Sequence, residues 1–142
     1  MADNPYPLPD RLTPTLQRVF DYWDDLRRGG NDMPFWDDVK PSALPDVADR
    51  LLLIDAFAEP ARFRINTIGA DVGESSALRG KFLDGEVLPG RLDYLLSQCG
   101  VTVEARAPTF YKHAGAPPYT RLLLPMWGDG HIGMLLGAVE LE

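Results

Sequence analysis

The chain has 142 residues, of which 45% are hydrophobic and 25% are charged, and this composition favours one soluble globular domain with a single core. Its formal net charge of −7 argues against binding nucleic acid or an anionic membrane surface through long-range electrostatics. No apolar run approaches the roughly 20 residues of a membrane-spanning helix, and the single cysteine, Cys99, excludes an internal disulfide, so we expect a cytoplasmic protein without a membrane partner.

The first 12 residues contain Pro5, Pro7 and Pro9, which restrict the backbone and remove hydrogen-bond donors. This segment has neither the basic start nor the apolar stretch of a secretory signal. We therefore expect residues 1–12 to form an extended amino-terminal arm and residues 13–142 to form one domain.

An amphipathic helix is predicted to begin at Thr13-Pro14, because threonine can cap a helix and proline suits its first position. The glycine pair Gly29-Gly30 is expected to end it. Its apolar residues recur at the spacing of one helical stripe: Leu16, Val19, Phe20, Trp23 and Leu26. We expect this stripe to pack on one face of a sheet.

The next segment, residues 31–40, is predicted to be a loop anchored by Phe35 and Trp36. A short helix is expected to follow from about Pro41, and Pro45 keeps it short.

Two strands are then predicted, at residues 51–57 and 62–68, joined by a tight turn. Alternation in the second strand places its arginines on one face. If that face lies under the amino-terminal helix, Arg64 can pair with Asp24 or Asp25 of the helix.

Glycines interrupt residues 70–88, which predicts short helical turns there rather than one long element. A longer helix is predicted from Pro89 to Arg106, although Gly100 weakens it, so a helix split at Gly100 is an alternative. Its predicted apolar stripe consists of Leu92, Leu95, Leu96, Cys99 and Val103. A short strand at residues 109–113 follows.

The carboxyl-terminal residues, 119–141, are predicted to form a long β-hairpin around Asp129-Gly130, because this dipeptide supplies the positive φ angles of a tight turn. Both pleat faces of the hairpin carry large apolar side chains, so helices must cover the sheet on both sides. A two-residue loop predicts two cross-strand pairs, Leu124 with Leu135 and Leu123 with Leu136.

The order of these elements, with five antiparallel strands divided into two and three by helices, resembles a PAS domain. Local sequence motifs, from about Thr13 to the end of the chain, resemble those of the single-domain PAS-like family of alphaproteobacteria. The segments that carry the resemblance are YWDDLRRGG at 22–30, PFWDDVKPSALPDV at 34–47, FRINTIG at 63–69, RGKFLD at 79–84 and YTRLLLPMWGDG at 119–130.

The resemblance implies an α+β fold and a non-enzymatic sensory or regulatory module in bacterial signalling, often a homodimer. Such a module binds a small ligand, a signalling partner or both. PAS-like domains commonly hold ligands between the concave sheet face and the middle helices, here residues 70–106.

Four residues are candidates for a ligand pocket with an aromatic wall and one cation: Tyr94, Phe110, Tyr119 and Arg121. A ligand-free dimerisation adaptor is an alternative function, and its interface would use Phe20, Trp23 and Leu26 with the outer sheet. A small cone-shaped α+β enzyme is a third interpretation, and it would use Tyr94, His113 or an aspartate in an apolar cavity.

Cofactor and metal sites are weakly indicated by the sequence. His113 and His131 could ligate haem, but with no Cys/His cluster we favour structural roles for both. Cys99 lies in a predicted core stripe and lacks the sequence context of a flavin-adduct cysteine. The pairs Asp24-Asp25 and Asp37-Asp38 fit solvated surface, because adjacent helical residues do not face each other.

Overall fold

A computed structural model describes residues 5–27, 32–58, 61–72, 78–85, 92–115, 118–128 and 130–141. They form an α+β structure built on one five-stranded antiparallel sheet with strand order β2-β1-β5-β4-β3. The main elements are α1 (Pro14–Asp25), β1 (Leu51–Ala58), β2 (Ala61–Ile68), α2 (Leu95–Ala105), β3 (Thr109–His113), β4 (Tyr119–Trp127) and β5 (Ile132–Leu141). Short 3₁₀ helices are η1 (Trp36–Asp38), η2 (Pro41–Ala43), η3 (Ala48–Arg50) and η5 (Leu83–Gly85).

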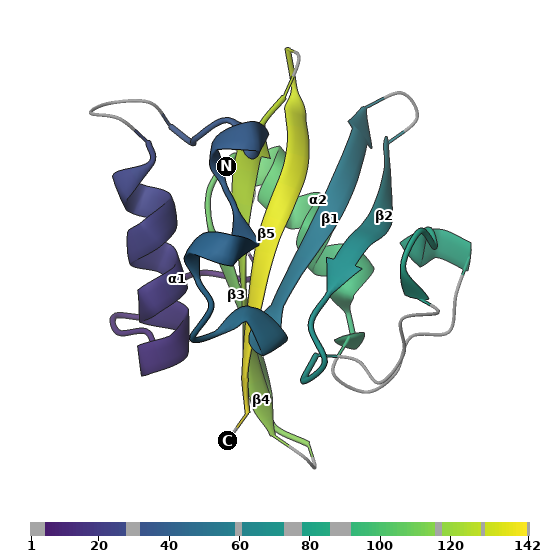
Figure 1. Ribbon diagram of the computed structural model, residues 1–142. Coiled ribbons are helices and arrows are strands. Elements are labelled where there is room, and N and C mark those ends of the chain that lie inside the picture. Colours follow the sequence, from purple (N-terminus) through teal and green to yellow (C-terminus); the bar gives the residue numbers. More distant parts are fainter. Residues whose placement is uncertain are drawn as a thin grey trace.

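The sheet is covered on both faces, as the doubly apolar hairpin predicts. Figure 1 shows α1 and the 3₁₀ helices η1 to η3 on one side of the sheet and α2 on the other. Strand β4 is the most enclosed element, because every residue from Tyr119 to Met126 is buried. Five antiparallel strands, divided into two and three by helices, are therefore confirmed.

Helix α1 packs on β5 and β4 through the predicted stripe. Leu16 and Val19 are fully buried, and Trp23 donates its Nε1 hydrogen to the carbonyl oxygen of Pro125 at 2.9 Å. The helix ends at Asp25, before the predicted glycine stop, which lies outside the described residues. No helix in the described ranges is both long and apolar enough to cross a membrane.

The predicted ion pair between Arg64 and the first helix is wrong. Arg64 instead donates from Nη2 to Oδ2 of Asp55, at 2.8 Å, across the pairing of β2 with β1. The reason is the strand order: β2 lies at the edge of the sheet, whereas α1 covers β4 and β5.

The predicted anchors of the loop at residues 31–40 are also wrong. Phe35 and Trp36 are 53% and 47% exposed, whereas Met33, Val39 and Leu44 are buried. The loop runs beside the end of β4, where the Trp127 backbone N–H bonds to the Pro34 carbonyl at 2.8 Å, and this leaves the two aromatic rings at the surface.

Helix α2 begins later than predicted, at Leu95, because Tyr94 has a left-handed φ of 58° that interrupts the helical backbone. Residues 89–91, where the sequence predicts the helix to begin, lie outside the described ranges. Gly100 does not split the helix. The buried face holds Leu95, Gln98, Cys99 and Thr102, whereas Leu96 is 41% exposed. Two polar residues thus occupy positions on the sheet side.

The predicted hairpin register is wrong by one residue. Trp127 pairs with Ile132 but Met126 pairs with Met134, so Gly133 is an extra residue in β5. Beyond this bulge, Leu124 faces Leu136 and Leu123 faces Gly137. The turn itself is as predicted at its described positions, because the Gly128 N–H bonds to the His131 carbonyl at 2.7 Å and Gly130 has a φ of 79°.

The register correction makes Gly137 a tight packing position. A Cβ added there would lie 2.4 Å from Leu52 Cδ2 and 3.0 Å from Leu123 Cδ2. We expect Gly137→Ala to lower the free energy of unfolding by about 1–3 kcal/mol through overpacking, measured by urea denaturation.

Gly100→Ala is the matched control, because a Cβ added there meets nothing within 4 Å. In a helix interior this change is expected to raise the free energy of unfolding by about 0.5–1 kcal/mol. Equal stability of the Gly137→Ala variant and the wild-type protein would contradict the close packing of β1, β5 and β4.

Candidate functional site

Aromatic and cationic side chains gather where β3 and β4 face α2. In the antiparallel pairing Tyr111 lies opposite Arg121 and His113 lies opposite Tyr119, so all four side chains share one pleat face. Tyr94 joins them from the start of α2, with its ring centroid 5.9 Å from that of Tyr111. We call these five residues the tyrosine–arginine cluster.

Arg121 is the buried base of the cluster, with no exposed surface. Its Nε donates to Oε1 of Gln98 at 2.7 Å, and its Nη2 donates to the Asp93 carbonyl at 2.8 Å. The guanidinium carbon lies 4.8 Å from the centroid of the Tyr111 ring. Burial lowers the pKa of Arg121, but an arginine keeps its charge in a protein, so a fixed cation sits between sheet and helix.

Gln98 is the residue that makes this burial feasible. Its Nε2 donates to Thr109 Oγ1 at 3.1 Å while its Oε1 accepts from Arg121, so the amide is used at both ends. Buried polar groups cost free energy unless they are paired. Gln98, a polar residue on the sheet side of α2, therefore stabilises the buried guanidinium of Arg121.

The tyrosine rings lead from Arg121 to the surface. Tyr111 is 5.9 Å from Tyr119 and lies in edge contact with Tyr6 of the amino-terminal arm at 6.2 Å. His113 stacks on Tyr119 with centroids 4.8 Å apart and an interplanar angle of 21°. Tyr94 is 68% exposed and forms the outer end.

The structure brings together three of the four predicted ligand residues. Phe110 is separated from them, because it lies opposite Leu122 on the other pleat face. The aromatic residue that belongs to the cluster is its neighbour Tyr111, which the sequence analysis missed together with Gln98. Knowledge of the β3–β4 register would have identified Tyr111, since residues two apart in a strand share a face.

The polar contacts of His113 within the described residues lie at one ring nitrogen, Nδ1. The Tyr111 hydroxyl and the nearer Asp93 carboxylate oxygen both approach Nδ1, at 3.0 Å and 3.9 Å. The other ring nitrogen, Nε2, lies against Gly115, where an added Cβ would be only 2.7 Å from it. Within the described residues His113 is thus held by a polar contact at Nδ1 and by close packing at Nε2, which fixes the orientation of its ring.

Two tyrosines of the cluster and the neighbouring Cys99 have raised pKa values. Burial raises the pKa of Tyr119 to about 12, against an opposing effect of Arg121, and raises the pKa of Tyr111 in the same direction. Burial also raises the pKa of the Cys99 thiol to about 12. At neutral pH these three groups therefore stay protonated and can donate hydrogen bonds.

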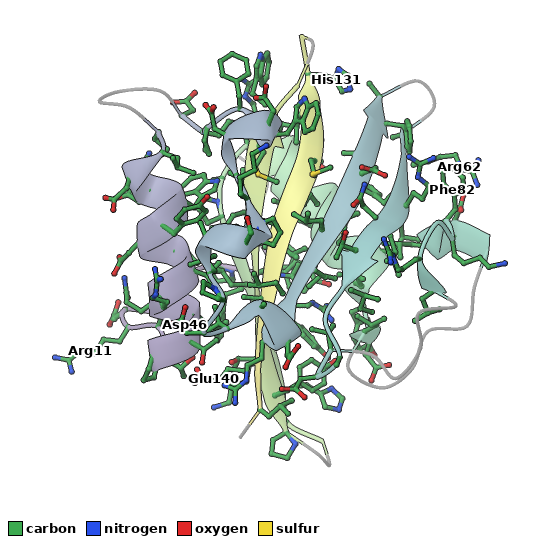
Figure 2. All side chains as sticks on the ribbon, viewed as in Figure 1. Arg11, Asp46, Arg62, Phe82, His131 and Glu140 are labelled. Atoms are coloured by element: carbon green, nitrogen blue, oxygen red, sulfur yellow. The ribbon has the colours of Figure 1, made fainter. Side chains whose placement is uncertain are left out.

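Other predicted sites are dispersed. Cys99 is buried and free. His131 lies at the tip of the β4–β5 hairpin (Figure 2), whereas His113 lies in the cluster on β3. Among the described residues no group of three or more His, Cys, Asp or Glu side chains is placed to hold a metal ion.

The three predicted interface residues on α1 differ in accessibility. Trp23 is 1% exposed and packs within the chain's own core, where a partner cannot reach it in this structure. Phe20 and Leu26 are partly buried against the same core. An interface through Phe20 and Leu26 stays a prediction.

Comparison of the sequence with protein-family models finds no match, and comparison with curated proteins finds no significant relative.

The contact between Arg121 and Gln98 can be tested by a double-mutant cycle. Arg121→Met leaves the Gln98 amide oxygen buried without its donor, so we expect it to lower the free energy of unfolding by about 2–3 kcal/mol. The double variant Arg121→Met/Gln98→Leu is expected to lose about 1–2 kcal/mol less than the sum of the single changes. Denaturant unfolding measures all three variants.

Arg18→Met is the matched control for removing an arginine. Arg18 lies on the exposed face of α1 and pairs with Asp46 at 3.3 Å, so we expect its loss to change the free energy of unfolding by less than about 0.5 kcal/mol. Strict additivity of the Arg121 and Gln98 changes would contradict a coupled buried contact.

The raised pKa of Tyr119 predicts a loss of stability at alkaline pH. The unfolded chain releases this proton near its ordinary pKa of 10, whereas the folded chain holds it to about pH 12. Stability is therefore retained below about pH 10 and lost as the pH rises toward 12. In Tyr119→Phe we expect the unfolding midpoint to fall less steeply over this interval, in denaturant titrations at a series of pH values.

Cys99 contributes to the same alkaline loss from about pH 9, because its ordinary pKa is 9.0. The Tyr119→Phe comparison is therefore made in a Cys99→Ala background. An identical pH profile with and without Tyr119 would contradict a buried, protonated phenol.

Proposed function

We propose that this chain is a non-enzymatic, PAS-like sensory or regulatory module of the bacterial cytoplasm, and that it reads a small ligand through the tyrosine–arginine cluster. Its sequence resemblance and the order of its elements support the PAS-like assignment. The antiparallel sheet with α2 against β3 and β4 provides the scaffold on which such a ligand element would sit.

The observation that carries the proposal is the backbone of Tyr94. A left-handed φ of 58° costs a non-glycine residue roughly 1–2 kcal/mol. Tyr94 is 68% exposed, so burial of its side chain offsets little of this conformational cost. Strained residues of this kind gather at functional sites, and here the strain places an aromatic ring at the outer end of a path that leads to a buried cation.

A ligand matched to this element would have a flat or apolar body and an acceptor group. The exposed ring of Tyr94 offers a stacking surface, and the hydroxyl and imidazole groups of Tyr111 and His113 offer polar contacts. A rearrangement at the start of α2 would then transmit binding, because Asp93, which bonds to Arg121, directly precedes Tyr94.

A ligand-free adaptor is the second candidate, and a different surface favours it. Phe35, Trp36 and Phe57 are each more than one third exposed, and Trp36 and Phe57 line a hollow of about 400 Å³ beside Met134. Exposed apolar clusters of this kind mark interaction surfaces. In this alternative the module would act by association through its aromatic surface.

Native mass spectrometry separates the two candidates. We expect protein freshly purified from its source cells to carry a stoichiometric small molecule that is lost on denaturation. The Tyr94→Gly variant is expected to keep or raise its thermal unfolding midpoint, because glycine accepts the left-handed backbone, and to lose the bound mass.

Leu96→Ser is the control, because Leu96 is also exposed on the first turn of α2 but lies outside the cluster. It is expected to retain the bound mass. A ligand-free protein would contradict sensing through the cluster, and a ligand-free dimer that Trp36→Ser dissociates would favour the adaptor.

A further inference from the structure

Two adjoining hollows lie where the carboxyl ends of α1 and α2 approach the end of β4. One, of about 240 Å³, is lined by Met33, Phe35 and Trp127, and the other, of about 260 Å³, by apolar groups that include Phe20. Asp32 and Arg106 line both hollows, so these two charged side chains form their common rim. We call the combined feature the Arg106 groove.

Arg106 has an unusual backbone for its residue type. It is the residue that ends α2, and its φ of 54° and ψ of 40° are left-handed, a conformation for which glycine is the usual choice at a helix end. The helix dipole favours a cation near the carboxyl end of α2, but the cation need not stand at position 106, where the backbone is left-handed. The strain fixes the direction in which the long side chain leaves the helix.

The Arg106 guanidinium is held over an aromatic ring and is available to a ligand. Its central carbon lies 5.2 Å from the centroid of Trp127, a cation–π contact that orients the planar group. Within the part of the chain that the structure describes, no carboxylate lies within ion-pair distance of Arg106. An oriented guanidinium with free donors is the group that binds a carboxylate at two points.

Asp32 supplies the opposite charge on the same rim. It too has no ion pair or side-chain hydrogen bond among the described residues, and none joins it to Arg106. A purely anionic ligand would be repelled by Asp32, and a purely cationic ligand by Arg106. The second arginine of the groove, Arg27, is already paired with Asp24 and therefore adds little net positive charge to the groove.

We propose that the Arg106 groove binds a free α-amino acid with a large apolar side chain. The ligand carboxylate pairs with Arg106, its ammonium group pairs with Asp32, and its side chain enters the hollow beside Phe35 and Trp127. A zwitterion satisfies both rim charges at once, and the hollow of about 240 Å³ beside Phe35 and Trp127 has room for one large side chain. This site lies at the opposite end of α2 from Tyr94 and is independent of the tyrosine–arginine cluster.

L-Phenylalanine is the probe, compared by isothermal titration calorimetry with its carboxamide and with N-acetyl-L-phenylalanine. Each analogue lacks one of the two charges, so we expect each to bind the wild-type protein about tenfold or more weakly than phenylalanine does. Arg106→Gln is expected to abolish the preference over the carboxamide. Asp32→Asn is expected to abolish the preference over the N-acetyl compound.

Arg18→Gln and Asp46→Asn are the matched controls, because these residues form an exposed pair elsewhere on the surface. Both are expected to bind as the wild-type protein does. Arg106→Gly provides a second test that relieves the left-handed strain, and we expect it to keep or raise the thermal unfolding midpoint while losing preference for the carboxylate.

Three results would overturn the proposal. They are the absence of phenylalanine binding at millimolar concentration, equal binding of all three compounds by the wild-type protein, and preferences that Arg106→Gln and Asp32→Asn leave unchanged. Loss of the ligand mass in Tyr94→Gly bears on the tyrosine–arginine cluster alone, so the two sites can fail separately.

Discussion

The enclosure of β4 on both faces is the constraint on which the rest of the structure depends. The side chains of β4 alternate between two buried layers, so one helix cannot cover both faces of the strand. Helix α1 covers one layer through Trp23, and α2 covers the other through Gln98. Arg121 lies on the α2 side, and this placement explains why a polar glutamine faces the sheet: a buried guanidinium needs an oriented acceptor.

Both edges of the sheet are occupied by the chain itself. On one edge the Phe110 N–H bonds to the Tyr6 carbonyl at 3.0 Å, and on the other the Ile65 N–H bonds to the Lys81 carbonyl at 2.9 Å. Beyond that second edge Arg62 lies over the Phe82 ring, as Figure 2 shows, with its guanidinium carbon 3.8 Å from the centroid. These contacts cover part of each edge and so limit the addition of a further strand there.

The two candidate sites share a construction principle. Tyr94 and Arg106 are the non-glycine residues with positive φ in the described chain, and they stand immediately before and after α2. Each strained backbone directs a large side chain, one toward the tyrosine–arginine cluster and one toward the Arg106 groove. Glycine would relieve the strain at both positions, so the large side chains at these positions carry a cost in stability.

The sequence by itself determined the features that depend on local periodicity and turn chemistry. These are the apolar stripe of α1, the five strands nearly to the residue, and the requirement for covers on both sheet faces. Only the tertiary structure decided the partners: Asp55 for Arg64, Tyr111 rather than Phe110 for Arg121, and the register set by the bulge at Gly133. A one-residue shift moves a strand side chain to the other face, and strand order depends on contacts between distant segments, so neither is encoded in any local pattern.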